Sequence, residues 1–187
     1  MTTGDLTGVV LAGGYSSRYG SDKALATYNG LTMTEHAVAA LRRICRTVVI
    51  SGDPQIYSRF GLRVVPDTTP HLGPVGGIAS VLASITSAKA IITACDMPLI
   101  TPGILRPLAC AEAEAAVWKD SDGSVFIFPM MLDRLKGHDA AMKLLSSGSR
   151  SVRALLRLLS VMELPLDNSL RRQMSNINSP SDTPQQS

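Results

Sequence analysis

A glycine-rich loop with two basic side chains follows the first apolar run of the chain. Gly13 and Gly14 open this loop, and Arg18 and Lys23 lie further along it. Glycine lets a backbone approach a ligand closely, and consecutive amides in such a turn form a concavity that binds anions. An arginine holds phosphate oxygens as a fork, whereas a lysine acts as a point charge. The loop at residues 11–23 is therefore predicted to bind phosphate groups.

This loop differs from the two common phosphate-binding loops. It contains neither Gly-x-x-x-x-Gly-Lys-Ser/Thr nor the dinucleotide pattern Gly-x-Gly-x-x-Gly. A strand-to-helix turn with solvent-exposed charges is the alternative interpretation. Phosphate binding is favoured because glycines, an arginine and a lysine share one loop at the end of a predicted strand, where α/β sheets bind ligands.

Asp96 directly follows another apolar run, Ala90–Cys95. Its carboxylate is a hard oxygen ligand of the kind that Mg2+ takes, usually together with phosphate oxygens. Pro98 favours an extended conformation for Met97, which predicts that the chain turns away and leaves Asp96 at the rim of the sheet. The sequence thus predicts a Mg2+ ligand at Asp96, and a plain turn aspartate is the alternative.

Three further polar side chains are candidates for contacts with a nucleotide or an acceptor. Asp53 follows an apolar run, and its carboxylate could accept both donors on the Watson–Crick edge of guanine. Because Pro54 comes next, Asp53 could equally cap a short helix. Asn176 and Asn178 lie two residues apart, so in an extended segment both amides would face one ligand. A pair of turn asparagines is the alternative for these two.

The pattern of apolar residues predicts the elements that position these groups. Runs typical of strands buried on both faces occur at Gly8–Ala12, Thr47–Ser51, Arg63–Val65 and Ala90–Cys95. Helices are predicted from a capping box of Thr32 and Glu35, over Pro74–Ser87, and from an N-cap at Thr101 towards Cys110. Alternation of strands and helices indicates an α/β fold with a parallel sheet in the first half.

The second half predicts an antiparallel part. Two apolar runs, Ala115–Trp118 and Val125–Phe128, flank an Asp-Gly turn. Helices over Asp139–Ser147 and Ser151–Leu159 and a strand over Val161–Leu166 are predicted to follow. We expect a single domain over residues 1–187, with a polar tail at 181–187 that frays.

The glycine-rich loop also carries a family resemblance. Residues 11–23 fit the pattern Leu-Ala-Gly-Gly-x-Ser-x-Arg-x-Gly-x-Asp-Lys at every fixed place. The chain thereby resembles the nucleotidyltransferases of the molybdenum cofactor, and is most similar to their guanylyltransferase branch. Three later segments agree in the same order: Gly73–Gly77, Cys95–Pro98 and Asn176–Pro180. The resemblance spans nearly the whole chain.

The resemblance implies a three-layer α/β/α nucleotidyltransferase fold of Rossmann-like type, a nucleoside triphosphate on the first loop, and Mg2+. The nucleotide-binding residues that it implies, with Asp53 added from the argument above, are Leu11, Ala12, Gly13, Gly14, Arg18, Lys23, Asp53 and Asp67. Asp96 would hold the metal and act in catalysis with Arg18 and Lys23, while Asn176 and Asn178 would face the pterin of the acceptor. Members of this branch append GMP from GTP to molybdopterin and release pyrophosphate. Asp53 departs from the asparagine that this branch often has at that place.

Bulk composition restricts the class of protein. The 187 residues are 45% hydrophobic and 18% charged, which suits a packed core and not a disordered chain. A net charge of +3 and 4% aromatic residues suit a small anionic ligand and are weak support for nucleic acid. The sequence shows neither a signal-peptide pattern nor an apolar run long enough for a membrane, and its three cysteines are widely spaced. We expect a cytoplasmic enzyme, whose candidate protein partners insert molybdenum or mature molybdoenzymes.

Other functions would use some of the same residues. A cytidylyltransferase for molybdopterin, or a nucleotidyltransferase for another phosphorylated metabolite, would use the same chemistry. A nucleotide-binding regulator without catalysis has less need of both Lys23 and Asp96. Arg150, Arg153 and Arg157 share one face of a predicted helix, where a solvated charged surface is favoured over contact with an acceptor phosphate or a partner enzyme.

Overall fold

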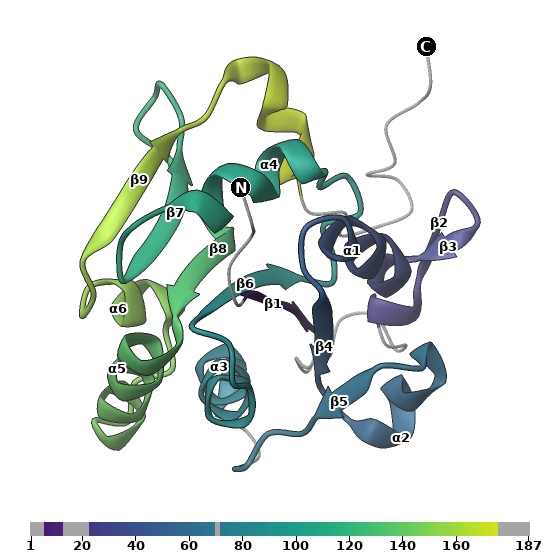
Figure 1. Ribbon diagram of the computed structural model, residues 1–187, viewed down its shortest axis with the longest axis horizontal. Coiled ribbons are helices and arrows are strands. Elements are labelled where there is room, and N and C mark those ends of the chain that lie inside the picture. Colours follow the sequence, from purple (N-terminus) through teal and green to yellow (C-terminus); the bar gives the residue numbers. More distant parts are fainter. Residues whose placement is uncertain (1–5, 13–22, 70–71, 176–187) are drawn as a thin grey trace.

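The computed structural model describes residues 6–12, 23–69 and 72–175, apart from the side chain of Lys23. A mixed sheet of seven strands runs through the middle of the molecule in the order β5-β4-β1-β6-β8-β7-β9 (Figure 1). Its strands are β1 (Leu6–Leu11), β4 (Thr47–Ser51), β5 (Arg63–Val65), β6 (Lys89–Ala94), β7 (Ala115–Lys119), β8 (Val125–Asp133) and β9 (Val161–Pro165). A separate short hairpin pairs β2 (Thr27–Tyr28) with β3 (Leu31–Thr32).

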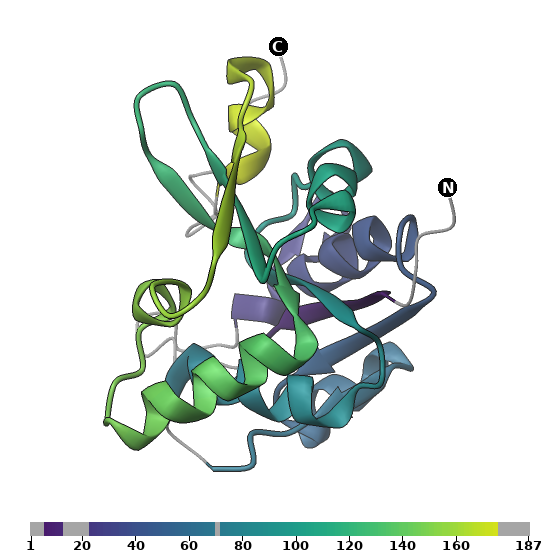
Figure 2. The same ribbon diagram turned by 60° about the vertical axis from the view of Figure 1, so that its left-hand side comes forward.

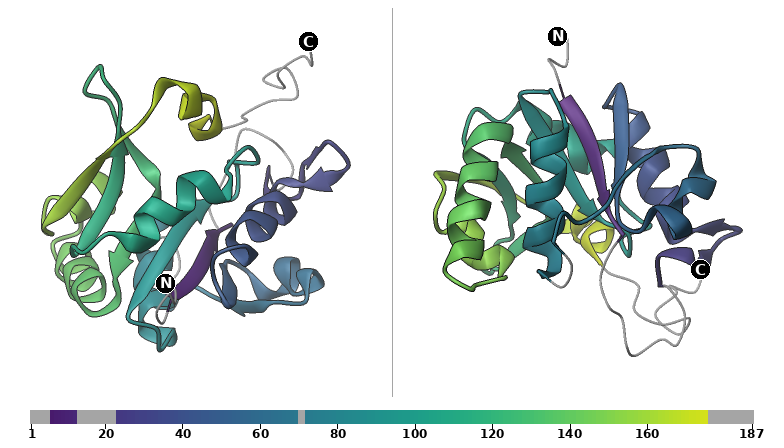
Figure 3. Two further views of the ribbon diagram at one scale, coloured as in Figure 1. Left: turned by 45° about the horizontal axis from the view of Figure 1, so that its top comes forward. Right: turned by 90° about the horizontal axis from the view of Figure 1, so that it is seen from below.

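Helices cover both faces of this sheet. The α-helices are α1 (Met33–Arg42), α2 (Pro54–Tyr57), α3 (Gly73–Ser84), α4 (Pro102–Cys110), α5 (Arg134–Ser146) and α6 (Val152–Leu156). Short 3-10 helices are η1 (Lys23–Leu25), η2 (Ser58–Phe60) and η3 (Asn168–Met174). Helices α1 and α4 lie on one face, and α3 and α5 lie side by side on the other (Figures 1 and 3). The predicted three-layer α/β/α fold is confirmed.

Strand direction determines which ends meet at each edge of the sheet. Strands β5, β4, β1 and β6 pair in parallel, whereas β8 runs antiparallel to both β6 and β7. Strand β9 is parallel to β7. The carboxyl ends of every strand except β8 therefore lie at the same edge, which we call the carboxyl edge. In open α/β sheets this edge is where ligands bind.

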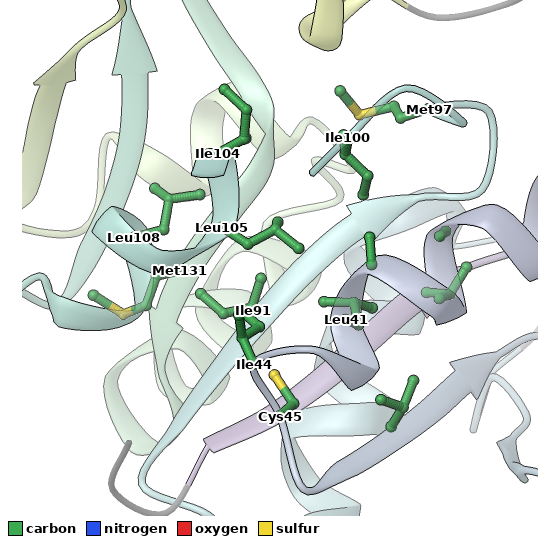
Figure 4. Packing of buried hydrophobic residues seen from close by; sticks show 14 of the residues in the cluster. Leu41, Ile44, Cys45, Ile91, Met97, Ile100, Ile104, Leu105, Leu108 and Met131 are labelled. Atoms are coloured by element: carbon green, nitrogen blue, oxygen red, sulfur yellow. The ribbon is translucent and has the colours of Figure 1, made fainter. Parts of the chain in front are cut away.

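Residues of the parallel strands alternate between two hydrophobic clusters. Val10, Ile50 and Ile91 belong to the cluster beneath α1 and α4, and their neighbours Val9, Val49 and Ile92 belong to the cluster beneath α3, α5 and α6. Figure 4 shows the first cluster, in which Leu41 of α1, Ile91 of β6 and Leu105 of α4 meet. Both faces of β1, β4 and β6 are buried, as their continuously apolar runs predict, whereas β5 at the edge of the sheet is only partly buried.

Several helix boundaries differ from the predicted ones. The capping box is confirmed, since Thr32 Oγ1 accepts from the Glu35 amide at 3.2 Å and Glu35 Oε2 accepts from the Thr32 amide at 2.7 Å. Helix α3 ends at Ser84, before the predicted Ser87, because Ile85 takes an extended conformation. Helix α6 ends at Leu156 and not at the predicted Leu159, and Arg157 forms its C-cap.

Helix α5 begins five residues before the predicted start at Asp139, at Arg134. The carboxylate of Asp133, the last residue of β8, accepts from the Lys136 amide at 2.9 Å and so caps the helix directly after the strand. Thr101 precedes α4 as predicted, but its hydroxyl does not cap the helix and donates instead to Gln173 Oε1 at 2.6 Å. In the described part of the chain, no helix has the length and apolar character that crossing a membrane requires.

Candidate functional site

The strand ends at the carboxyl edge continue to pair beyond the strands themselves. The amide of Ala12 donates to the Ser51 carbonyl at 2.9 Å, and the amide of Cys95 donates to the Leu11 carbonyl at 3.1 Å. The amide of Gly52 donates to the Val65 carbonyl at 3.0 Å. These bonds hold four chain segments in register at the point where each one leaves the sheet. The segments that carry Asp53, Asp67 and Asp96 therefore leave one edge, next to the start of the glycine-rich loop.

The described residues on either side of the glycine-rich loop are anchored by hydroxyl groups. The buried Tyr57 donates from Oη to the carbonyl of Ala12 at 2.6 Å. On the returning side, Thr34 Oγ1 donates to the carbonyl of Ala24 at 2.8 Å, and Thr34 is fully buried. Leu11 and Ala12, two of the predicted nucleotide-binding residues, thus occupy fixed positions at the carboxyl edge. Sequence reasoning missed Tyr57, which no local pattern distinguishes from a core residue.

Asp53 caps α2. Its Oδ1 accepts from the Gln55 amide at 2.8 Å, and the residue is exposed to solvent. The capping interpretation of the sequence is therefore confirmed, whereas contact with a guanine base stays a prediction. The cap also has an indirect role, because the short helix that begins at Pro54 carries Tyr57 to the carbonyl of Ala12.

Asp67 lies half-buried against helix α3. A Cβ atom placed on Gly77 would stand 3.2 Å from Asp67 Oδ1 and 2.7 Å from Ser51 Oγ, so a residue without a side chain is needed there. Burial raises the pKa of the Asp67 carboxyl above its ordinary value. The chain next to it is held by Ser80, whose Oγ accepts from the Thr68 amide at 2.9 Å. The sequence shows Gly77 as part of the segment Gly73–Gly77, but only the tertiary packing shows why a glycine is needed at this position.

Asp96 lies half-buried in the turn after β6. The next residue, Met97, is 1% exposed and belongs to the cluster beneath α1 and α4, so the turn is anchored from below. Asp96 thus stands at the carboxyl edge with a fixed backbone. One carboxylate at this place fits Mg2+, which commonly takes one or two protein carboxylates and completes its shell with phosphate oxygens and water. No group of three or more metal-binding side chains forms among the described residues, so the fit depends on phosphate oxygens.

Several predicted site residues lie outside the described part of the chain. These are Gly13, Gly14, Arg18, Asn176 and Asn178, together with the side chain of Lys23. Their roles in binding the phosphates and the acceptor remain predictions. The described structure limits where they start, because residue 13 follows the anchored Ala12 and residue 176 follows Ser175 at the end of η3.

The arginines that the sequence places on one predicted helix face are exposed to solvent: Arg150, Arg153 and Arg157. Arg153 belongs to α6 and Arg157 forms its C-cap. Arg150 precedes this helix, and its Cβ atom lies 3.8 Å from a Cβ built on Gly73, the first residue of α3. Arg150 is therefore near the beginning of α3, whereas a contact with an acceptor or a partner stays untested.

Comparisons with known proteins agree with this geometry. Residues 8–164 match the family model of the MobA-like NTP transferase domain. The chain is 36% identical over 180 residues to a molybdenum cofactor guanylyltransferase of Xanthomonas euvesicatoria, covering 93% of this chain and 90% of that protein. A second relative of that name, from Cupriavidus metallidurans, is 30% identical over 185 residues and has the same coverage of both chains.

Solved structures share the fold. The molybdopterin-guanine dinucleotide biosynthesis protein A of Archaeoglobus fulgidus superimposes with a TM-score of 0.79 at 22% identity, covering 95% of this chain and 94% of that one. The family match covers the strands of the carboxyl edge and the segments that carry Asp53, Asp67 and Asp96. The resemblance read from the glycine-rich loop is confirmed: this chain belongs to the MobA-like NTP transferase family.

Proposed function

We propose that this chain is a molybdenum cofactor guanylyltransferase, which transfers GMP from GTP to the terminal phosphate of molybdopterin in its molybdenum-loaded form. The observation that carries the proposal is the 36% identity to a protein of that activity over 93% of the chain. The geometry supports it, because Asp67, Asp96 and the fixed start of the glycine-rich loop lie at one sheet edge.

The proposed reaction is one in-line displacement. An oxygen of the acceptor phosphate attacks the α-phosphorus of GTP, and a new phosphoanhydride bond forms. The bond between the α-phosphorus and the oxygen that bridges to the β-phosphate breaks, and pyrophosphate leaves with that bonding pair. The acceptor is a phosphate monoester and is largely anionic at neutral pH, so its oxygen needs no strong general base. No covalent enzyme intermediate is required.

The catalytic problem is the mutual repulsion of the triphosphate and the acceptor. In the proposal, Lys23 and Arg18 bind phosphate oxygens and offset the charge that develops on the leaving pyrophosphate. Asp96 would hold Mg2+, which as a bound cation would supply further charge neutralisation at the phosphates. Asp67 lies beside Ser51 and α3, where it would contact the nucleotide.

The test is a pyrophosphate-release assay with molybdopterin and each of the four nucleoside triphosphates in turn. We expect release with GTP that depends on both molybdopterin and Mg2+. Faster turnover with CTP would reassign the protein as a cytidylyltransferase. The exposed position of Asp53 is compatible with either base, so the assay decides between them. GTP binding without pyrophosphate release in the presence of the acceptor would favour a nucleotide-binding regulator.

A further inference from the structure

Residues 120–124 join β7 to β8 in a turn that stands beyond the carboxyl edge. Strand β8 pairs with β6 so that Met130 lies opposite Ile92, and the first residues of β8 therefore extend past Ala94, the last residue of β6. Figures 2 and 3 show this hairpin projecting from the sheet, with η3 beside it. The hairpin is on the β8 side of Asp96, and β1, the strand that leads to the glycine-rich loop, is on the other side.

Arg171 ties η3 to the hairpin turn through two carboxylates. Its Nη1 lies 3.2 Å from Asp120 Oδ2 and 3.1 Å from Asp122 Oδ2. The Asp120 side chain is 0% exposed, and its other oxygen accepts from the amides of Asp122 at 3.0 Å and Ser124 at 2.8 Å. A buried carboxylate is costly unless it is hydrogen-bonded and paired with a cation. The turn and η3 therefore depend on each other for their positions.

A second set of contacts ties η3 to the start of α4. Gln173 Oε1 accepts from Thr101 Oγ1 at 2.6 Å across 72 residues of sequence. Met174 is 5% exposed and packs into the same cluster as Met97, the residue that follows Asp96. Residues 167–175 thus connect the hairpin turn to the segment that carries Asp96.

We infer that residues 167–175 form the acceptor-side wall of the site and that Arg171, paired with Asp120, is a positioning residue for the acceptor. The inference rests on the proposed function. The wall is on the β8 side of Asp96, and the strands that lead to the proposed nucleotide side are on the other side of Asp96. The acceptor would then bind between the wall and the nucleotide. Two carboxylates already neutralise Arg171, so it acts by holding the wall in place and not by binding a phosphate. Asn176 directly follows the wall in the sequence.

The molecule contains its own reporter for the wall. Trp118 is the single tryptophan of the chain and is 4% exposed. It belongs to the same cluster as Met174 of η3, and the partly buried Leu170 of η3 packs against that cluster. Its indole Nε1 is buried and has no hydrogen-bond partner among the residues that the structure describes. Because an indole is sensitive to the entry of water, a displaced wall should shift the emission of Trp118 to longer wavelength.

The experiment compares Arg171→Ala with Arg106→Ala, which removes the same charge from an exposed position on α4, outside the wall. We expect Arg171→Ala to raise KM for molybdopterin about tenfold, equivalent to ~1.4 kcal/mol. The kcat and the GTP affinity should stay near those of the wild type, which is the signature of lost acceptor binding alone. Arg171→Lys should recover part of the effect, and Trp118 emission should shift in Arg171→Ala but not in Arg106→Ala.

Equal KM values for the two alanine variants, or a parallel loss of GTP affinity in Arg171→Ala, would overturn the inference. If Arg171→Ala does not fold, Gln173→Ala loosens the other end of the wall and must give the same split between KM and GTP affinity. A wild type that releases no pyrophosphate with GTP and molybdopterin counts against the proposed function instead. In that case identical Trp118 spectra for Arg171→Ala and Arg106→Ala still overturn the inference that Arg171 holds the wall.

Discussion

Three carboxylates at the carboxyl edge have different surroundings, and those surroundings separate their roles. Asp53 is exposed and uses one oxygen to cap a helix. Asp67 is half-buried beside Gly77 and Ser51, and burial raises its pKa. Asp96 is half-buried in a turn that Met97 anchors in the core. Residue type alone does not distinguish them, whereas burial and hydrogen bonding do.

Asp96→Asn tests the proposed metal ligand. The amide keeps the shape of the carboxylate and removes one charge, so the protein should fold while Mg2+-dependent turnover falls by about 10²-fold or more. Turnover is measured over a Mg2+ titration, with unfolding followed in parallel. The control is Asp139→Asn, which changes a carboxylate that is 83% exposed on α5. Wild-type turnover in Asp96→Asn, or activity of the native enzyme in excess chelator, would refute the assignment.

Asp67→Asn tests the effect of burial on stability. Because the pKa of Asp67 is raised in the folded protein, its proton is held more tightly there than in the unfolded chain. Its contribution to stability is complete below the unfolded pKa and is lost as pH rises through the folded pKa. We therefore expect Asp67→Asn to have a higher Tm than the wild type at neutral pH, without nucleotide, and the difference to shrink as pH falls. A difference that grows in acid would contradict this.

At the scale of elements, two close contacts hold the strand ends that lead to the site. Helix α2 delivers Tyr57 to the carbonyl of Ala12, and helix α3 approaches Ser51 and Asp67 at Gly77. Neither contact follows from the periodicity of its own helix. Each contact joins a helix to a strand end at the carboxyl edge, where we propose that the nucleotide binds.

Tyr57→Phe removes the buried hydroxyl and leaves the Ala12 carbonyl without this donor. We expect a loss of ~1–3 kcal/mol in the free energy of unfolding, the cost of an unsatisfied buried acceptor. GTP affinity should fall as well, because the proposed phosphate-binding loop continues directly from Ala12. Chemical denaturation and calorimetry measure the two effects. Tyr28→Phe, in the short β2–β3 hairpin, is the control and should change neither quantity.

Gly77→Ala places a methyl group 2.7 Å from Ser51 Oγ, closer than packing allows. We expect a destabilisation of ~1–3 kcal/mol from the displaced helix. Adding Ser51→Ala removes the oxygen and should restore part of the loss. The matched control is Gly103→Ala in α4, where the nearest atom is Thr101 Oγ1 at 3.4 Å, and this change should be neutral or mildly stabilising. Equal stability of the two alanine variants would mean that α3 accommodates the methyl group.

At the scale of the whole molecule, the site joins two halves of the chain that differ in strand direction. The parallel half ends at the proposed nucleotide side, and the antiparallel hairpin with residues 167–175 stands on the opposite side of Asp96. This division predicts that binding of nucleotide and binding of acceptor can be impaired separately.

The double variant Asn176→Ala with Asn178→Ala tests that separation. Each lost hydrogen bond to a neutral partner costs ~0.5–1.5 kcal/mol, so both residues are changed together. The apparent requirement for molybdopterin should rise, while the GTP affinity measured by calorimetry stays near that of the wild type. Asn29→Gly, which removes an exposed amide side chain from the β2–β3 turn at a position of positive φ, is the control. An unchanged acceptor requirement, or an equal loss of GTP affinity, would place the two asparagines elsewhere.

The sequence by itself determined the layers of the fold, the start of α1 and the family. Strands β1, β4 and β6 are apolar on both faces, and the Thr32–Glu35 box closes within three residues, so these signals are local. The glycine-rich loop is contiguous in the chain, and its pattern identified the nucleotidyltransferase family without a structure. The early start of α5 at Arg134 was missed because its cap, Asp133, is also the last residue of a strand.

Only the tertiary structure decided which distant side chains hold the site in place. Tyr57 reaches Ala12 across 45 residues, Thr101 turns from its expected cap to Gln173 across 72, and Arg171 pairs with Asp122 across 49. Periodicity and capping patterns extend over a few residues, whereas these partners meet because packing brings separate elements together at one edge of the sheet. Gly77 shows the same division: its presence was visible in the sequence, and its reason, the approach of α3 to Ser51 and Asp67, exists only in the folded protein.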